Sequence, residues 1–170
     1  SRYGVAIDAL VSQFTIGEIE NAVIQAFEQE QPDIILIEGQ SAVSHPAFMG
    51  SLAILRGSMP DGIILQHPPA RQFRCDFPLL KMPSIASEIQ LIEAISQSKV
   101  MAIALSHENL TNLQVDRTIE DYETQFRLPT TDVLNYGCQK LIAALGDRFP
   151  QLNQIIKRKS LEIIPLLAVG

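Results

Sequence analysis

Side chains that could do chemistry gather next to apolar runs of the sequence. Glu38 ends the run Ile34–Ile37, and the loop after it is rich in hydrogen-bonding groups. The clusters are Asp8 within the first run, then Glu38 to His45, then His67 to Arg71, then Ser106 to Asn109. If the runs are parallel strands of one sheet, their C-terminal ends lie at one edge, where open α/β sheets bind ligands. We therefore expect the clusters to converge on a single crevice.

Asp8 and Glu38 are the acids expected to lie near a metal. In P-loop nucleotide-binding proteins, an acidic residue at the end of a strand holds Mg²⁺ beside the phosphates, directly or through water. Both acids suit such a place, because Asp8 interrupts an apolar run and Glu38 ends one. We expect the two carboxylates to approach each other at one edge of the sheet. The competing interpretation is that Glu38 only caps the next turn.

His45 is the candidate general base, with Glu38 as its catalytic neighbour. It lies seven residues after Glu38 in a loop that must fold back over the strand ends, and Pro46 fixes its exit into the next helix. A neighbouring carboxylate such as Glu38 would orient the imidazole ring. Alternatively, the ring of His45 hydrogen-bonds to the backbone where that helix begins.

The remaining polar residues are candidates for binding a substrate or cofactor. They are Gln40, Ser44, His67, Arg71, Ser106 and Asn109. Arginine suits a planar carboxylate or phosphate through paired hydrogen bonds, and the alternative for Arg71 is a surface ion pair with an acid. A serine hydrolase fits less well, because Gly39–Val43 lacks the second glycine of the nucleophile elbow. His45 and His67 also lack the spacing of zinc ligands.

The elements that must position these residues alternate along the chain. Apolar runs typical of strands fall at residues 3–11, 34–37, 61–66 and 99–105. Apolar spacing and capping residues predict helices over 15–29, 47–56, 87–97, 117–126 and 133–145. Residues 72–86 are expected to form a loop, and the tail fits a helical turn at 155–156 or an edge strand at 161–164. The alternation predicts a three-layer αβα fold with a mostly parallel sheet.

The composition is that of one globular domain over residues 1–170. Hydrophobic residues make up 46% and charged residues 19%, so a disordered chain is not expected. The net charge of −6 argues against nucleic acid as a partner, and no apolar run approaches the roughly 20 residues that span a bilayer. Cys75 and Cys138 form no C-x-x-C pair, so we expect a cytoplasmic protein. A small molecule is the expected partner, with a homo-oligomer left open.

No G-x-x-x-x-G-K-[ST] sequence occurs in these residues, although that loop supplies the backbone donors and the lysine that cradle phosphates. The chain opens with Ser1-Arg2 and enters an apolar run almost at once, whereas a free terminus usually has several poorly ordered polar residues. We therefore expect the later part of a domain. Either the Walker A loop lies upstream of Ser1, or the domain does not bind nucleotide.

Several motifs together resemble one known family. They are Tyr3–Val11, Ile37–Gln40, Ser44–Pro46, Gly57-Ser58, Pro60-Asp61, His67 with Arg71, and Leu128–Asp132. Over most of residues 3–145 the chain is similar to the C-terminal P-loop domain of a bacterial and archaeal family, some of whose members are assigned as D-glutamate N-acetyltransferases (the DgcN family). The resemblance implies a P-loop NTPase-like domain whose first strand and Walker A loop lie upstream of Ser1, after a Rossmann-like N-terminal domain. It also implies acetyl-CoA as the acyl donor and a small amino acid as the acceptor.

The same arrangement resembles the dethiobiotin synthetase branch of P-loop proteins. That likeness implies Asp8 and Glu38 as acids near Mg²⁺. It also matches two segments to the loops that flank a purine base. They are Ser106–Asn109 and Pro129–Asp132, and the second contains the candidate binding residues Thr131 and Asp132. The leading hypothesis is an enzyme domain that transfers an acyl group to a small amino-acid substrate. The alternatives are an ATP-dependent ligase or kinase of the dethiobiotin synthetase type, and a non-catalytic module that binds a nucleotide or a partner.

Overall fold

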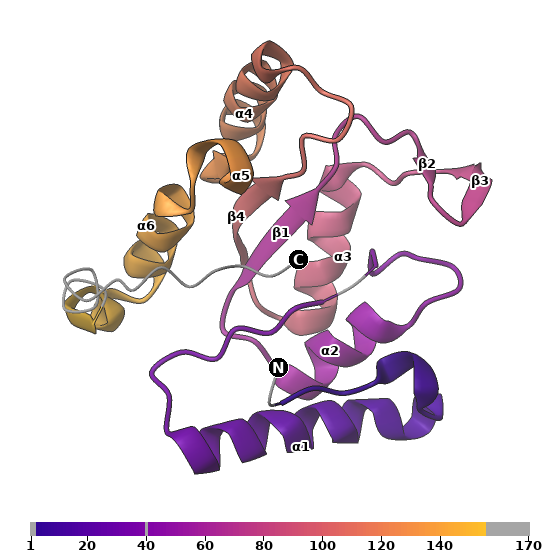
Figure 1. The fold of residues 1–170 in the computed structure, drawn as a ribbon, viewed down its shortest axis with the longest axis vertical. Coiled ribbons are helices and arrows are strands. Elements are labelled where there is room, and N and C mark those ends of the chain that lie inside the picture. The colour runs from indigo at the N-terminus through magenta and orange to yellow at the C-terminus, as the bar shows by residue number, and fades with distance from the viewer. Residues whose placement is uncertain (1–2, 40, 156–170) are drawn as a thin grey trace.

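The computed structural model describes residues 3–39 and 41–155 (Figure 1). Gln40 and the edge strand expected at 161–164 lie outside these residues. The helices are α1 (Ser12–Glu30), α2 (Gly50–Ser58), α3 (Ile85–Ser96), α4 (Asn112–Phe126), α5 (Val133–Tyr136) and α6 (Gln139–Arg148), with 3-10 turns η1 (Ile7–Ala9) and η2 (Pro150–Leu152). The strands are β1 (Ile63–His67), β2 (Phe73–Arg74), β3 (Phe77–Lys81), β4 (Val100–Leu105) and β5 (Thr130–Thr131).

A parallel sheet in the order β1-β4-β5 forms the centre of the described fold. β4 is the middle strand, and its Ala104 pairs with Gln66 of β1 and Thr131 of β5. The strands predicted at 61–66 and 99–105 are confirmed as β1 and β4. The carboxyl ends of all three strands therefore meet at one edge, as the alternating sequence pattern predicted.

Side chains of β4 alternate between the two faces of the sheet and so define the layers. On one face, Ile103 and Leu105 pack in a core with side chains of α3 and α4. On the other face, Ala102 packs against Leu141 and Ala144 of α6. Figure 1 shows α3 and α6 on opposite sides of the strands. The three-layer αβα arrangement predicted from the sequence is confirmed.

Two of the predicted strands are wrong. Residues 3–11 form irregular chain and the η1 turn, and residues 34–37 belong to no strand or helix. Leu36 is 81% exposed, although the run Ile34–Ile37 was expected to be buried on both faces. A strand is held by hydrogen bonds to a neighbouring strand, and β1 has a ladder partner, β4, on one side within the described residues. These runs consequently have strand-forming side chains but no strand to pair with.

The first two helices pack against each other beside the sheet. α1 confirms the helix predicted at 15–29, although Val11 rather than a polar side chain precedes it. α2 begins at Gly50, three residues later than the helix predicted at 47–56. Gly57 allows the close approach of the two helices, because a Cβ there would lie 2.5 Å from the backbone oxygen of Ile16.

The loop expected at 72–86 contains a hairpin. β2 and β3 pair antiparallel, with Arg74 opposite Phe77, and the amide of Met82 donates to the oxygen of Gln72 at 2.8 Å. Pro78 lies near the start of β3 in this two-stranded sheet, where a missing N–H is tolerated. Figure 1 shows the hairpin projecting from the body of the molecule, and Leu79 in the middle of β3 is 91% exposed.

Local capping explains how the later helices differ from the predictions. α4 begins five residues before the expected start because Thr111 and Gln114 form a capping box. The helix predicted at 133–145 is divided at Gly137, whose φ of 76° suits glycine, so that α5 and α6 are separate. None of the helices in the described part of the chain is long and apolar enough to cross a membrane.

Candidate functional site

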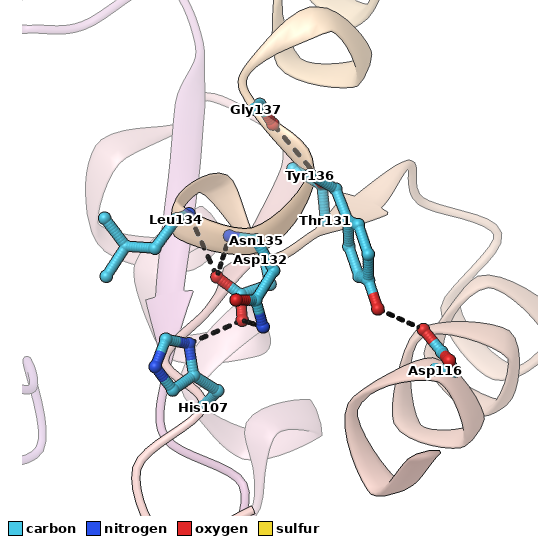
Figure 2. Close-up of polar contacts among 8 residues, drawn as sticks. All are labelled: His107, Asp116, Thr131, Asp132, Leu134, Asn135, Tyr136 and Gly137. Carbon is cyan, nitrogen blue, oxygen red and sulfur yellow. Dashed lines mark hydrogen bonds and ion pairs between the residues drawn. The ribbon is translucent and has the colours of Figure 1, made fainter. Parts of the chain in front are cut away.

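His107 and Asp132 meet at the carboxyl edge of the sheet (Figure 2). His107 follows β4 by two residues, and Asp132 follows β5 directly. The Nδ1 atom of His107 lies 2.6 Å from Oδ2 of Asp132. The carboxylate side chain is 1% exposed, whereas the imidazole is 40% exposed. A buried carboxylate thus holds one nitrogen of a ring that solvent can reach.

Asp132 is fixed because both of its oxygens accept hydrogen bonds. Oδ1 accepts from the backbone amides of Leu134 at 3.0 Å and Asn135 at 3.3 Å, which makes Asp132 the N-cap of α5. Oδ2 accepts from the side-chain amide of Asn135 at 2.9 Å, in addition to its contact with His107. Because a carboxylate so placed accepts from Nδ1–H, the ring tautomer follows from the contact, and no described residue bonds to the other nitrogen, Nε2.

A cleft of about 450 Å³ lies beside the free face of this imidazole. Its described lining comes from the ends of β1 and β4, the segment after β4, and α5: Gln66, Ala104, Leu105, Ser106, His107, Glu108, Val133 and Leu134. Leu134 is 84% exposed and forms an apolar wall. The volume is in the range of sites for small molecules. The cleft combines a few polar groups with apolar walls, as small-molecule sites generally do.

Arg71, in the turn after β1, contacts one of the residues that line this cleft. Its guanidinium Nη2 donates to Oε2 of Glu108, and Glu108 lines the cleft. This hydrogen bond raises the pKa of Arg71 above its ordinary value. The contact is the ion pair with an acid that was the alternative for Arg71, and the role of Arg71 in binding a substrate stays a prediction.

His67 faces the other side of the sheet. Its neighbour Gln66 lines the cleft, so the alternation of β1 turns the ring of His67 toward Tyr122 of α4, with ring centroids 5.9 Å apart. Burial there lowers the pKa of His67. His67 is not among the described lining residues of the cleft, and its proposed role in binding a substrate stays untested.

His45 lies in a separate cluster near the hairpin. Its Nδ1 accepts from the amides of Ala47 and Phe48, each at 3.2 Å, and its ring stacks on Phe48. Ser44 beside it accepts two hydrogen bonds from Nη2 of Arg74. This is the backbone-bonded alternative considered from the sequence, and none of these contacts involves Glu38.

Asp8 follows Ile7 and Glu38 precedes Gly39 in the chain, and both Ile7 and Gly39 lie close to the first turn of α2. A Cβ at Gly50 would lie 3.3 Å from the side chain of Ile7, and a Cβ at Gly39 would lie 3.9 Å from the hydroxyl of Ser51. Within the described residues, no group of three or more His, Cys, Asp and Glu side chains is arranged to hold a metal. A shared Mg²⁺ between the two acids stays a prediction, and no chemical step below depends on it.

The other predicted binding residues divide between the cleft and the core. Ser106 lines the cleft, and its amide donates to the oxygen of His67 at 2.9 Å. Asn109 has a φ of 59°, next to Glu108. Thr131 is buried, with its hydroxyl directed to the oxygen of Gly137 at 3.4 Å (Figure 2), which is a structural role.

The sequence placed the stretch Ser106–Asn109 at the end of a buried strand but gave no role to its two central residues, which are those that contact Asp132 and Arg71. Leu134 was not predicted as part of the site, and it gave no signal, because it lies in a helix that looked continuous.

Comparison with known proteins places these features in a family context. The P-loop domain of DUF1611, a domain of unknown function, matches residues 1–142. The chain is 32% identical over 148 residues to a D-glutamate N-acetyltransferase of Pseudoalteromonas sp, and 26% identical over 149 residues to one of Tritonibacter scottomollicae. Each match covers 84% of this chain and 44% of the relative, so the chain spans less than half the length of these curated relatives.

A solved structure shares the fold. The crystal structure of a DUF1611 family protein from Anabaena variabilis matches with a TM-score of 0.78 and 28% sequence identity. The match covers 85% of this chain and 43% of that chain.

Proposed function

The chain belongs to the DUF1611 P-loop domain family, and from that premise we propose that it is part of an enzyme that transfers an acyl group to the amine of a small amino-acid substrate. The names of two relatives support this reaction class. The observation that carries the proposal is the contact between His107 and the buried Asp132 at the wall of the cleft.

The proposed chemistry follows from the ring nitrogen that is left free. An amino-acid amine is protonated near neutral pH and must lose a proton before it attacks an acyl carbon. Nε2 of His107 accepts that proton, and Asp132 stabilises the imidazolium that forms. The new C–N bond replaces the bond between the acyl carbon and its leaving group, which departs with the electron pair and takes the proton from His107. The second proton that the nitrogen loses as the amide forms passes to solvent.

Acetyl-CoA is the proposed donor. Its thioester sulfur would be the leaving group, so the products are an N-acetyl amino acid and free CoA. No Walker A sequence is present in these residues, and we assign no side chain of this chain to the phosphates of the donor.

The test is a pair of identical substitutions in the full-length protein, His107→Gln and His45→Gln. Acetyl transfer from acetyl-CoA to D-glutamate is followed by mass spectrometry and by release of the CoA thiol. His107→Gln should lower kcat by roughly 10²–10⁴-fold with unchanged circular dichroism. His45→Gln should keep most of the activity, because that ring accepts from backbone amides.

Three outcomes would contradict the proposal. The wild-type protein could fail to acetylate any amino acid, His107→Gln could retain near wild-type kcat, or His45→Gln alone could abolish activity. The last result would instead support His45 as the general base expected from the sequence.

A further inference from the structure

The ion pair between Arg71 and Glu108 joins the turn after β1 to the segment after β4. Both side chains are partly exposed, at 33% for Arg71 and 40% for Glu108. Exposed ion pairs contribute little to stability, so fastening two loops is a weak explanation for the contact. Its position at the edge of the cleft that His107 lines calls for a second explanation.

Two N–H groups lie along one edge of the Arg71 guanidinium, and only one of them has an acceptor among the described residues. Nη2 and Nε point in parallel along the same edge of the group, and a carboxylate usually accepts from both. Here Nη2 donates to Oε2 of Glu108, whereas the buried Nε has no acceptor among the described residues. Oε1 of Glu108 lies instead 3.5 Å from the side-chain amide of Asn109. With Glu108 in this position, the edge keeps one buried donor without an acceptor among the described residues.

We propose that Glu108 holds the place of a substrate carboxylate on Arg71. A carboxylate of the amino-acid acceptor accepts from both Nε and Nη2, and Glu108 turns away toward solvent. Two charge-assisted bonds then replace one, and the buried Nε gains the acceptor that it lacks. The inference rests on the proposed function, because it names the group by which the acceptor is bound.

The same geometry gives selectivity. Glu108 competes with any carboxylate for Arg71, so a weakly binding monoacid displaces it less readily than a ligand that also has contacts elsewhere in the cleft. His107 is adjacent to Glu108 in the chain and lines the same cleft. A carboxylate seated on Arg71 therefore belongs to a molecule that extends into the space beside the proposed base.

The experiment measures binding of glutarate to the full-length protein by isothermal titration calorimetry. Glutarate has the carboxylates of the acceptor but no amine, so it cannot be acylated. Its diamide, glutaramide, is the matched neutral ligand. Glu108→Gln should tighten glutarate binding on the order of tenfold by removing the competing charge, and Arg71→Lys should weaken it by a similar factor. Glutaramide binding should be equal in all the proteins.

The double variant Arg71→Lys with Glu108→Gln separates the proposal from a general charge effect. If Glu108 acts through Arg71, the gain from Glu108→Gln disappears in the double variant. A gain that persists there, or weaker glutarate binding by Glu108→Gln alone, would overturn the inference.

The acetylation assay keeps this result distinct from that of the proposed function. If glutarate binding depends on Arg71 but no acetyl transfer occurs, the carboxylate site is supported and the proposed function is wrong. If acetyl transfer occurs but Arg71→Lys does not change the KM for D-glutamate, the proposed function is supported and the carboxylate site is wrong.

Discussion

Two regions of the molecule contain apolar runs but differ in how far the side chains of those runs are buried. The first region extends from β1 to η2, and the second from residue 3 to α2. In the first region, Ile103 is fully buried between layers of helices. In the second, Leu36 is 81% exposed and Phe14 is 66% exposed. The difference shows that strand-forming side chains are not enough, because a run becomes a buried strand only where a neighbouring strand and a covering helix are both available.

The two regions also use histidine differently. His107 is bound by a buried side-chain carboxylate and keeps one nitrogen free at a cleft. His45 accepts from two backbone amides ahead of α2 and stacks on a phenylalanine. The first arrangement leaves a group available for proton transfer, whereas the second uses the ring to order a turn.

The largest expected effect comes from Asp132→Asn. The asparagine oxygen can still cap α5, but its amide would face Nδ1 of His107 and favour the tautomer with the proton on Nε2. We expect kcat to fall by roughly 10²–10⁴-fold, with a small change in melting temperature. Imidazole ¹⁵N shifts read the tautomer directly.

Tyr136→Phe is the matched control for that substitution. It removes the hydrogen bond from the Tyr136 hydroxyl to Asp116 at the other end of α5 and leaves the contact between His107 and Asp132 in place (Figure 2). It should leave the tautomer unchanged. A normal kcat in Asp132→Asn would show that the contact with Asp132 gives His107 no catalytic role that His45 lacks.

An intermediate effect is expected from truncating one apolar side chain in each region, because the loss of stability should differ between the two. Ile103→Ala removes a fully buried side chain and should lower the free energy of unfolding by about 2–5 kcal/mol. Leu36→Ala should change it by no more than about 0.5 kcal/mol, because that side chain is exposed. Urea denaturation of the full-length protein measures both. A large loss from Leu36→Ala would mean that the run at 34–37 is covered in the intact molecule.

The smallest expected effect concerns the pH dependence of stability. Burial lowers the pKa of His67 in the folded protein below the value of 6.5 that the unfolded chain keeps. As the pH falls below that value, the unfolded state binds a proton more readily, and stability is lost until the pH passes below the folded pKa. His67→Gln should therefore lose roughly 1–2 °C less in melting temperature between about pH 7.5 and about pH 5.5. An equal loss in both proteins would show that the ring of His67 is not buried.

Local signals were sufficient for β1, β4 and α1, because short apolar runs and helical spacing determine those elements where packing partners exist. They were not sufficient for the contact between His107 and Asp132, which lie 25 positions apart. That contact depends on β5 pairing with β4, and β5 has only two residues and no strand signal of its own. The strand predicted at 34–37 failed for the same reason, because pairing is a property of distant segments.

The edge of β1 that faces away from β4 has a practical consequence for anyone who handles this chain. It has no ladder partner among the described residues, and it carries the apolar sequence Ile63-Ile64-Leu65. An apolar strand with unpaired backbone groups is a template on which further copies can add and aggregate. Where nothing covers that edge, inclusion bodies are the expected product of expression. A preparation that stays monomeric at high concentration would mean that another segment covers it.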